Sequence, residues 1–509
     1  MFSIDSHLLQ TKLEKLPKIN IPKCSLHFHY ELINQIYNIH KKWDTQYKFQ
    51  KIKQQINCTE NEICSNFDFS IPSMLSAILF LYKKGQESWD RLMQTAGISE
   101  NTHNLLYQFL KTKEEYENTY NMNDLNYIQS LSSSLIQFLL VNSQVVPSIY
   151  GQLWNIQPHL YGYFVPLNVQ HSYEKQLNCI QTHQWETDQG HFTLKILSPE
   201  YSIDKSIMNS IQFRLYMMIA LQDKTEWHCK NLLVNWIPSS RRKLLYVDDC
   251  IINRNCKTCN VKWNSYQINT GATYRKTCDT LAVWRKEEAG KTFVHEMMHS
   301  LSFDFEDELD TGKWIQQHFA LEKETPVLFF ESYVETWATI LNIYIIGAQR
   351  AHGVVRGSEG PSQNNMNYSQ LEVFLEKETQ FILWQVSKIL YHSGFDKFSS
   401  FFKRDHGHTL YSKWNTKFSQ STSVLSYFII KSAHLWNINW FISTFIHPRL
   451  MSNPNRPTQL NWLRKLLDIF EDQVYQDTIN LYIKTYDRLY RKSPDSFLCT
   501  TMRMTLFED

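Results

Sequence analysis

Residues 285–305 read RKEEAGKTFVHEMMHSLSFDF and contain the pattern His295-Glu-Met-Met-His299. The spacing of the apolar residues predicts a helix that begins at about Arg285. Two histidines four residues apart lie one above the other on one helical face, so both imidazoles can reach one tetrahedral zinc ion at about 2.0–2.1 Å. Glu296 is rotated by about 100° from His295 and can meet a water on the metal without binding the metal itself. The pattern therefore predicts a Zn²⁺ site with Glu296 as the catalytic base.

The remaining side chains of this helix are mostly large and apolar: Phe293, Val294, Met297, Met298 and Leu301. An apolar surface on most sides of a helix predicts that the helix is buried, and buried imidazoles need partners such as a metal ion. The alternative is a helix at the surface or at the edge of the core, whose histidines bind nothing. Glu287 and Glu288 are expected in the first turn, where the helix dipole favours carboxylates. Gly290 costs a helix about 1 kcal/mol, and the sequence offers no reason for it.

A second stretch, residues 329–338 (FFESYVETWA), offers a third ligand. A catalytic zinc usually has three protein ligands and a water. Glu331 and Glu335 share one face of an otherwise apolar helix, where a buried carboxylate is costly unless it is paired or binds a metal. The alternative is a solvated stripe of two carboxylates. No His-x-x-Gly-x-x-His continuation follows His299, which disfavours a metzincin site.

The two helices together resemble those of the gluzincin group of zinc metallopeptidases. In that group the third ligand is a glutamate with a small residue three positions later, and Glu335-Thr-Trp-Ala338 is similar to this pattern. The resemblance implies that His295, His299 and Glu335 bind zinc. It further implies that the substrate is a peptide or protein. Because Glu331 and Glu335 lie one turn apart, only one should reach the zinc, and Glu331 is expected to accept a hydrogen bond from a ligand histidine instead.

More narrowly, the chain resembles uncharacterised metallopeptidase-like proteins of large nucleocytoplasmic DNA viruses. The likeness covers roughly residues 185–440 and is carried by residues 269–299, 331–338 and 422–428. It implies an enzyme of the host cytoplasm or the virion, which associates with the particle or with other proteins through its N-terminal region. The alternative is a structural or virion assembly protein that keeps the fold without catalysis. Glu296 argues against that alternative, because a purely structural site needs no base.

The resemblance also implies a substrate-binding strand, because zincins bind extended peptides by backbone hydrogen bonds at a sheet edge beside the metal helix. Residues 269–274 or 280–284 are candidates for that strand, and an ordinary sheet strand is the alternative. Asn269, Thr270 and Gly271 are the substrate-binding candidates.

A donor to the developing oxyanion is also expected, and Tyr427 in the buried-looking helix SVLSYFIIK is the candidate. The alternative for Tyr427 is a core tyrosine bonded to backbone, and His352 and His392 are competing donors.

Hydrophobic periodicity divides the chain into three regions. Residues 1–184 read as mostly helical, with helices at 72–83, 86–111 and 124–141. Residues 185–320 read as an α/β unit with the histidine-bearing helix, and residues 321–509 read as helices that include the third ligand. Within the central unit the patterns predict a helix at 205–221 and strands at 191–197, 232–237, 244–247, 266–274 and 280–284. We therefore expect a mostly helical α+β protein with a zincin-like core of a small mixed sheet, the histidine helix and the glutamate helix.

Composition excludes several other classes of protein. The 509 residues carry a formal net charge of +2 and are 14% aromatic, which excludes a disordered chain and argues against a nucleic-acid binder. No apolar run reaches the ~18 residues of a membrane span, and no signal-peptide layout begins the sequence, so a cytoplasmic protein with reduced cysteines is expected. Cys250, Cys256, Cys259 and Cys278 could bind a structural zinc or form disulfides. Arg241-Arg242-Lys243 reads as a solvated turn and His406-Gly-His408 as a loop pair.

Overall fold

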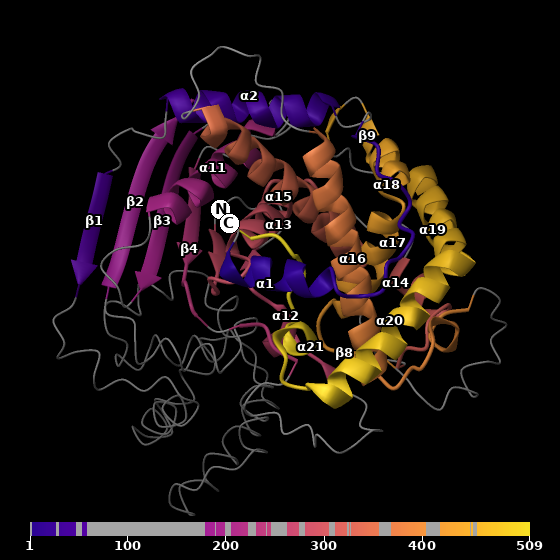
Figure 1. Cartoon of the computed structure of the whole chain (residues 1–509). Helices are drawn as coiled ribbons and strands as arrows, with labels where there is room; N and C mark the ends of the chain where they lie inside the picture. Colours follow the sequence, from indigo (N-terminus) through magenta and orange to yellow (C-terminus); the bar gives the residue numbers. More distant parts are fainter. Residues whose placement is uncertain are drawn as a thin grey trace, which may run out of the picture.

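The fold is taken from a computed structural model of the chain (Figure 1). The structure describes residues 3–26, 30–46, 53–58, 179–188, 190–198, 205–221, 231–240, 242–245, 262–273, 280–304, 311–322, 325, 327–355, 368–403, 418–447, 449–450 and 456–508. The helices expected at 72–83, 86–111 and 124–141 lie outside these residues. So do the four candidate cysteines and the pair His406 and His408.

A six-stranded mixed sheet forms one side of the molecule, with the order β1-β2-β3-β4-β7-β6. Its strands are β1 (Lys53–Cys58), β2 (Cys179–Thr187), β3 (Gly190–Ser198), β4 (Asn231–Trp236), β7 (Thr280–Val283) and β6 (Gly271–Thr273). The inner pairs β3–β4 and β4–β7 are parallel, whereas β1–β2, β2–β3 and β6–β7 are antiparallel. On β3 the side chains of Phe192, Leu194 and Ile196 are buried in alternation with more exposed residues, as one buried sheet face requires.

Helices cover this sheet and continue into a large helical body (Figure 1). Helix α11 (Lys205–Leu221) connects the parallel strands β3 and β4, and α13 (Ala289–Ser300) follows β7. Helix α13 packs against α11, against β6 and β7, and against the long helix α15 (Phe330–Val355). Helix α2 (Tyr30–Gln46) lies across α11 and α15. The histidine helix therefore has the sheet on one side and the glutamate helix on another.

The rest of the described body is helical, with a few short paired strands. Its helices are α1 (Ile4–Leu13), α12 (Ser265–Ile268), α14 (Thr311–Gln316), α16 (Tyr368–His392), η3 (Phe398–Ser400), the π-helix η5 (Leu425–Ile430), α17 (Lys431–Trp436), α18 (Ile438–Phe445), α19 (Arg456–Glu471), α20 (Gln473–Lys492) and α21 (Phe497–Thr500). Its short strands are β5 (Lys262–Trp263), β8 (Ser419–Gln420), β9 (Ile446–His447) and β10 (Arg449–Leu450). Residues 501–507 are all buried. This C-terminal segment returns to the N-terminus, where the amide of Ser3 donates to the carbonyl of Glu508 at 2.9 Å.

The expected fold class is confirmed, because the protein is a mostly helical α+β structure with a mixed sheet. Helix α11 and strands β3, β4 and β7 lie where periodicity predicted them. Of the strand expected at 244–247, only Leu244 and Leu245 lie in the described part of the chain, and Leu244 forms a single antiparallel β-bridge to Thr501. The expected strand at 266–274 is only half right, since residues 265–268 form α12 and the strand β6 begins at Gly271. The division at residues 184 and 320 stays a prediction, although β1 and β2 join the N-terminal region to the sheet.

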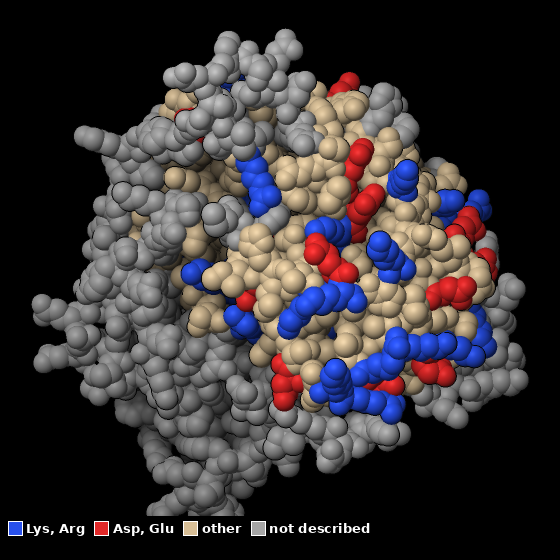
Figure 2. All heavy atoms as spheres, viewed as in Figure 1, with Lys and Arg blue, Asp and Glu red and all other residues tan. Residues whose placement is uncertain are grey.

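None of the described helices is long and apolar enough to cross a membrane. On the face shown in Figure 2, lysine and arginine side chains are interspersed with carboxylates, in keeping with the small net charge.

Candidate metal centre

Helix α13 begins four residues later than expected, at Ala289, because Glu288 adopts a left-handed conformation with φ 58°. This conformation is costly for a residue with a side chain, so the surroundings must hold it. The carboxylate of Glu288 accepts the backbone N–H groups of Met504 and Thr505, both at 2.6 Å, and pairs with the Lys243 ammonium at 2.7 Å. Lys243 is therefore fully buried, which corrects its placement in a solvated turn. Burial lowers the pKa of Lys243 to about 8, although Glu288 opposes this change.

Gly290 has a steric explanation that the sequence did not show. A Cβ atom at this position would lie 2.8 Å from Cζ of Arg214 on α11, so only glycine leaves room for the guanidinium. The same Arg214 donates to Asn342 on α15 at 2.9 Å. One buried arginine thus links the first turn of α13 to both neighbouring helices.

The side chains of His295, His299 and Glu331 meet at one point between α13 and α15. The two Nε2 atoms are 3.2 Å apart, and Oε2 of Glu331 is 3.3 Å from each of them. Ligands at about 2.0–2.1 Å in tetrahedral geometry are separated by about 3.3–3.4 Å. The three donor atoms therefore have the spacing of three ligands around one small metal ion. The two histidines are 6% and 5% exposed, which leaves little room for water to solvate them instead.

The other nitrogen of each histidine is bonded to a carboxylate. Nδ1 of His295 lies 2.9 Å from Oε2 of Glu335, and Nδ1 of His299 lies 2.8 Å from Oδ2 of Asp304. A carboxylate next to Nδ1 accepts the ring N–H, which leaves the lone pair on Nε2. Both imidazoles are thus oriented with their Nε2 atoms ready to bind a metal.

Glu331 and Glu335 stand in the reverse of their expected positions. Glu331 meets the two Nε2 atoms, whereas Glu335, expected as the third ligand, lies one turn further along α15. The only contact of Glu335 with the two histidines is to Nδ1, the outer nitrogen of His295. Two buried lysines hold Glu335 there: Lys291 lies 2.8 and 2.7 Å from its two oxygens, and Lys431 lies 3.0 Å from Oε1. The Ala338 pattern could not reveal these lysines, because it concerns only the spacing of the two helices.

The charges around the donor atoms favour a cation between them. Burial lowers the pKa of His299, but the carboxylates of Glu331 and Asp304 outweigh burial and raise it to about 10. Burial raises the pKa of Glu331, but His299 and His295 outweigh burial and hold it far below its usual range. A divalent cation would satisfy the same carboxylate that now attracts both imidazoles.

Glu296 is buried beside this group but points toward the sheet edge. A Cβ atom at Gly271 of β6 would lie 2.8 Å from Oε1 of Glu296 and 2.7 Å from the methyl group of Thr292. The absence of a side chain at Gly271 therefore lets β6 approach the Glu296 carboxylate. Burial raises the pKa of Glu296, although the two histidines oppose this change.

Tyr427 lies at the centre as well, on the π-helix η5. Its ring centroid is 5.8 Å from that of His295, and its hydroxyl lies near the carboxylate of Glu331. Burial, together with this carboxylate, keeps the pKa of the hydroxyl well above its usual value, so Tyr427 retains its proton. The competing residue His392 lies elsewhere, bonded to the Tyr486 hydroxyl at 2.8 Å, and the side chain of His352 lies outside the described part of the chain.

The three substrate-binding candidates have different environments. The Asn269 side chain accepts a hydrogen bond from Thr422 at 2.8 Å, and the Thr270 carbonyl accepts the Trp284 N–H at 2.9 Å. Hydrogen-bonded and non-hydrogen-bonded residue pairs alternate along an antiparallel ladder. Thr270 and Trp284 form a hydrogen-bonded pair, so the next pair, Gly271 and Val283, is not hydrogen-bonded. The N–H and C=O of Gly271 therefore face away from β7. Within the described sheet β6 is the outer strand.

The structure adds residues that the sequence reasoning missed. Asp304 contacts His299, and Lys291 and Lys431 contact Glu335, which in turn contacts His295. Lys291 could have been found, because it precedes His295 by four residues and therefore shares its helical face. Lys431 comes from α17, and no local spacing indicates its place.

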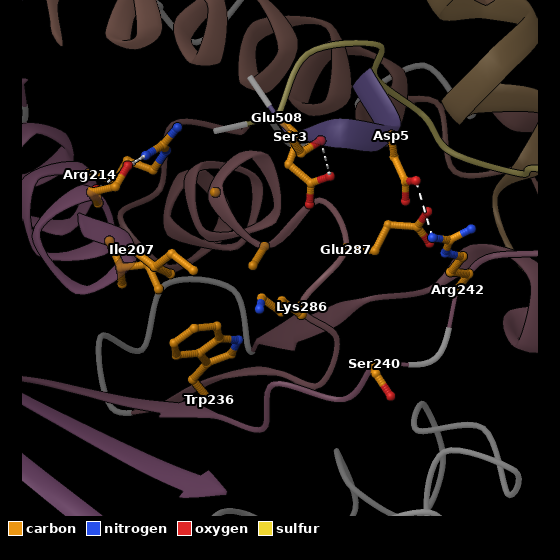
Figure 3. Close-up of a pocket in the computed structure, with 14 residues that line it drawn as sticks. Ser3, Asp5, Ile207, Arg214, Trp236, Ser240, Arg242, Lys286, Glu287 and Glu508 are labelled. Atoms are coloured by element: carbon orange, nitrogen blue, oxygen red, sulfur yellow. Dashed lines mark hydrogen bonds and ion pairs between the residues drawn. The ribbon is translucent and has the colours of Figure 1, made fainter. Parts of the chain in front are cut away.

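A separate cavity of about 250 Å³ lies at the N-terminal end of α13 (Figure 3). Trp236 and Ile207 contribute apolar wall, and its charged residues are Arg214, Arg242, Lys286, Asp5, Glu287 and Glu508. Three cations thus face three carboxylates, and one of these pairs, Arg242 with Asp5, is in contact at 3.1 Å. The cavity favours neither sign of charge and includes no residue of the metal centre.

Comparison with known proteins identifies no relative: no family model, curated protein or solved structure matches this chain. Function must therefore be argued from the site itself.

Proposed function

We propose that this protein is a zinc-dependent metallopeptidase of gluzincin type. The observation that carries the proposal is the triangle of His295, His299 and Glu331 donor atoms, with Glu296 beside it on the same helix. Two imidazoles and one carboxylate form a donor set that suits zinc and leaves a fourth position for water or substrate. Glu331 takes the role of third ligand, and Glu335 and Asp304 take the roles of outer carboxylates on the histidines.

Zinc held by His295, His299 and Glu331 would supply Lewis-acid chemistry to the scissile carbonyl and would make a water more acidic. Glu296 accepts the proton of the attacking water at its carboxylate and passes it to the nitrogen of the leaving amine. Tyr427 donates its hydroxyl hydrogen to the oxyanion that develops on the carbonyl oxygen. The position of the Tyr427 ring, 5.8 Å from that of His295, supports this role, because it places the tyrosine beside the histidine helix.

Strand β6 supplies the binding surface for an extended peptide. The outward N–H and C=O of Gly271 pair with the substrate backbone, as in strand addition at other sheet edges. Asn269 and Thr270 act indirectly, since their bonds to Thr422 and Trp284 fix the strand beside α13. Strand addition places the scissile bond next to Glu296, which lies against Gly271.

The main alternative is a metal site that serves structure or virion assembly only. Under either function, the place of action that we propose is the host cytoplasm or a viral particle. Glu296 favours the enzyme, because its carboxylate is buried beside the histidines without being one of the three converging ligands.

Cleavage of a peptide library, measured by mass spectrometry, distinguishes the two functions. The zinc-loaded protein should cleave peptides, and Glu296→Gln should keep zinc while losing roughly 10²–10⁴-fold in rate, because an amide cannot accept the proton. Glu471→Gln, on the exposed end of α19, is the control and should cleave normally. A zinc-loaded protein that cleaves nothing would favour the structural alternative, and a fully active Glu296→Gln variant would exclude Glu296 as the base.

A further inference from the structure

Glu335 has an unusual environment for a residue next to a metal centre. It is fully buried on α15 and receives two ammonium groups, from Lys291 on α13 and from Lys431 on α17. Lys291 contacts both carboxylate oxygens, and Lys431 also donates to the carbonyl of Met504 at 2.6 Å. Both lysines are almost completely buried, with side chains 3% and 0% exposed.

Two buried ammonium groups on one carboxylate are costly, since each loses its hydration. Burial lowers the pKa of Lys291, but Glu335 and Glu288 outweigh burial and raise it above its usual value. The same lysines hold the pKa of Glu335 well below its usual range, against the effect of burial. Glu335 is therefore a carboxylate with both oxygens engaged by cations.

The geometry has a direct consequence for His295. With Lys291 and Lys431 on Glu335, the oxygen Oε2 is fixed 2.9 Å from Nδ1 of His295 and accepts its proton. Glu331, one turn earlier, receives no lysine among the described contacts and meets the Nε2 atoms. The lysines thus distinguish two glutamates that sequence spacing leaves equivalent.

We propose that Lys291 and Lys431 are positioning residues of the metal centre: they hold Glu335 off the metal and against Nδ1 of His295, so that Nε2 of His295 is presented for metal binding. This inference rests on the proposed metal site and adds to it the reason why Glu331, not Glu335, is the third ligand. The lysines touch neither the metal nor the substrate and act only through Glu335.

A double-mutant cycle on zinc affinity tests this chain of contacts. The dissociation constant of zinc is measured by chelator competition for the intact chain, Lys291→Met, Glu335→Gln and the double variant. Each single variant should weaken zinc binding roughly 10–100-fold, as losses of outer partners of metal ligands do. The double variant should bind within about threefold of Glu335→Gln alone, because Lys291 has no route to the metal except Glu335.

Lys243→Met is the matched control. Lys243 is equally buried and paired with a carboxylate, Glu288, at the start of the same helix, but Glu288 contacts neither histidine in the described bonds. Lys243→Met should lower the melting temperature while keeping zinc affinity within about threefold of the intact chain. If the role of Lys291 were merely structural, Lys291→Met and Lys243→Met would have similar melting temperatures and similar zinc affinities.

The outcomes separate this inference from the proposed function. An intact chain without zinc affinity overturns both. An intact chain that binds zinc, with Lys291→Met binding it equally well, overturns the inference alone. The inference is also overturned if the loss of zinc affinity in the double variant is the product of the two single losses. Such a result would show that Lys291 affects zinc binding by a route other than Glu335. If Lys291→Met does not fold, two other variants replace it. The first is the double variant, which removes the lysine and the charge of Glu335 together, and the second is Lys431→Met. Both should show the affinity of Glu335→Gln, and unchanged affinity in either overturns the inference.

Discussion

At the scale of single residues, small and charged side chains decide what the candidate metal centre can do. Glycines at 271 and 290 create space, one for the Glu296 carboxylate and one for the Arg214 guanidinium. Neither glycine stands in a conformation that requires it, so neither role is visible in the sequence. The roles of Glu331 and Glu335 on α15 are equally hidden in the sequence. Their spacing puts both on one helical face, and only Lys291 and Lys431, which come from other elements, separate their roles.

Gly271→Ala should damage catalysis without removing zinc. Its Cβ would lie within 2.9 Å of three atoms of Thr292 and Glu296, so either β6 or the Glu296 carboxylate must move. A displacement of the order of 1 Å at a catalytic group costs roughly 10²-fold in rate. Steady-state cleavage and zinc content of the same preparation check this expectation.

Gly347→Ala is the control for that variant. Its Cβ would meet the flexible end of the Leu371 side chain, in a part of α15 four turns away from Glu331 by residue number. It should change stability and leave the rate unaltered. Equal rates for Gly271→Ala and the intact chain would show that β6 does not approach Glu296 as described.

At the scale of elements, a chain of hydrogen bonds ties three helices together behind the metal centre. Trp462 on α19 donates to Nε2 of His434 on α17 at 2.9 Å. Nδ1 of His434 lies 2.8 Å from the Thr336 hydroxyl, which itself donates to the Ser332 carbonyl on α15 at 2.6 Å. Because Nε2 of His434 accepts the Trp462 N–H and the Thr336 hydroxyl donates elsewhere, His434 is neutral with its proton on Nδ1. Burial lowers the pKa of His434 to about 3.

His434 should therefore make stability depend on pH. Its folded pKa lies below its unfolded value of about 6.5, so protons bind preferentially to the unfolded chain and the stabilisation is lost as pH falls below 6.5. Between pH 7 and pH 5 this residue should remove about 2 kcal/mol from the free energy of unfolding. Urea unfolding of the metal-free chain at both pH values measures the loss.

His434→Gln is the comparison, because glutamine does not titrate. Its free energy of unfolding should be lower at pH 7 but should fall by about 2 kcal/mol less on going to pH 5. Identical losses for the two chains would mean that His434 is already charged, or exposed, in the folded protein.

At the scale of the whole molecule, the elements with strong periodicity were predictable and the convergence of distant segments was not. Helix α11 and strands β3 and β7 follow from local apolar patterns, and so does the pairing of His295 with His299 on one face. By contrast, the buried segment 501–507 and helix α17 reach the centre only through tertiary packing. Met504 contacts Lys431 and Glu288, so three regions far apart in sequence share one buried ionic cluster.

The most direct test of the central claim is zinc content and zinc affinity of Glu331→Ala and Glu335→Ala, measured beside the intact chain. The intact chain should carry about one zinc. Glu331→Ala should lose it, because a ligand is gone, whereas Glu335→Ala should retain zinc with affinity reduced by roughly 10–100-fold. An intact chain without zinc, or a Glu331→Ala variant that keeps full affinity while Glu335→Ala loses the metal, would contradict the account.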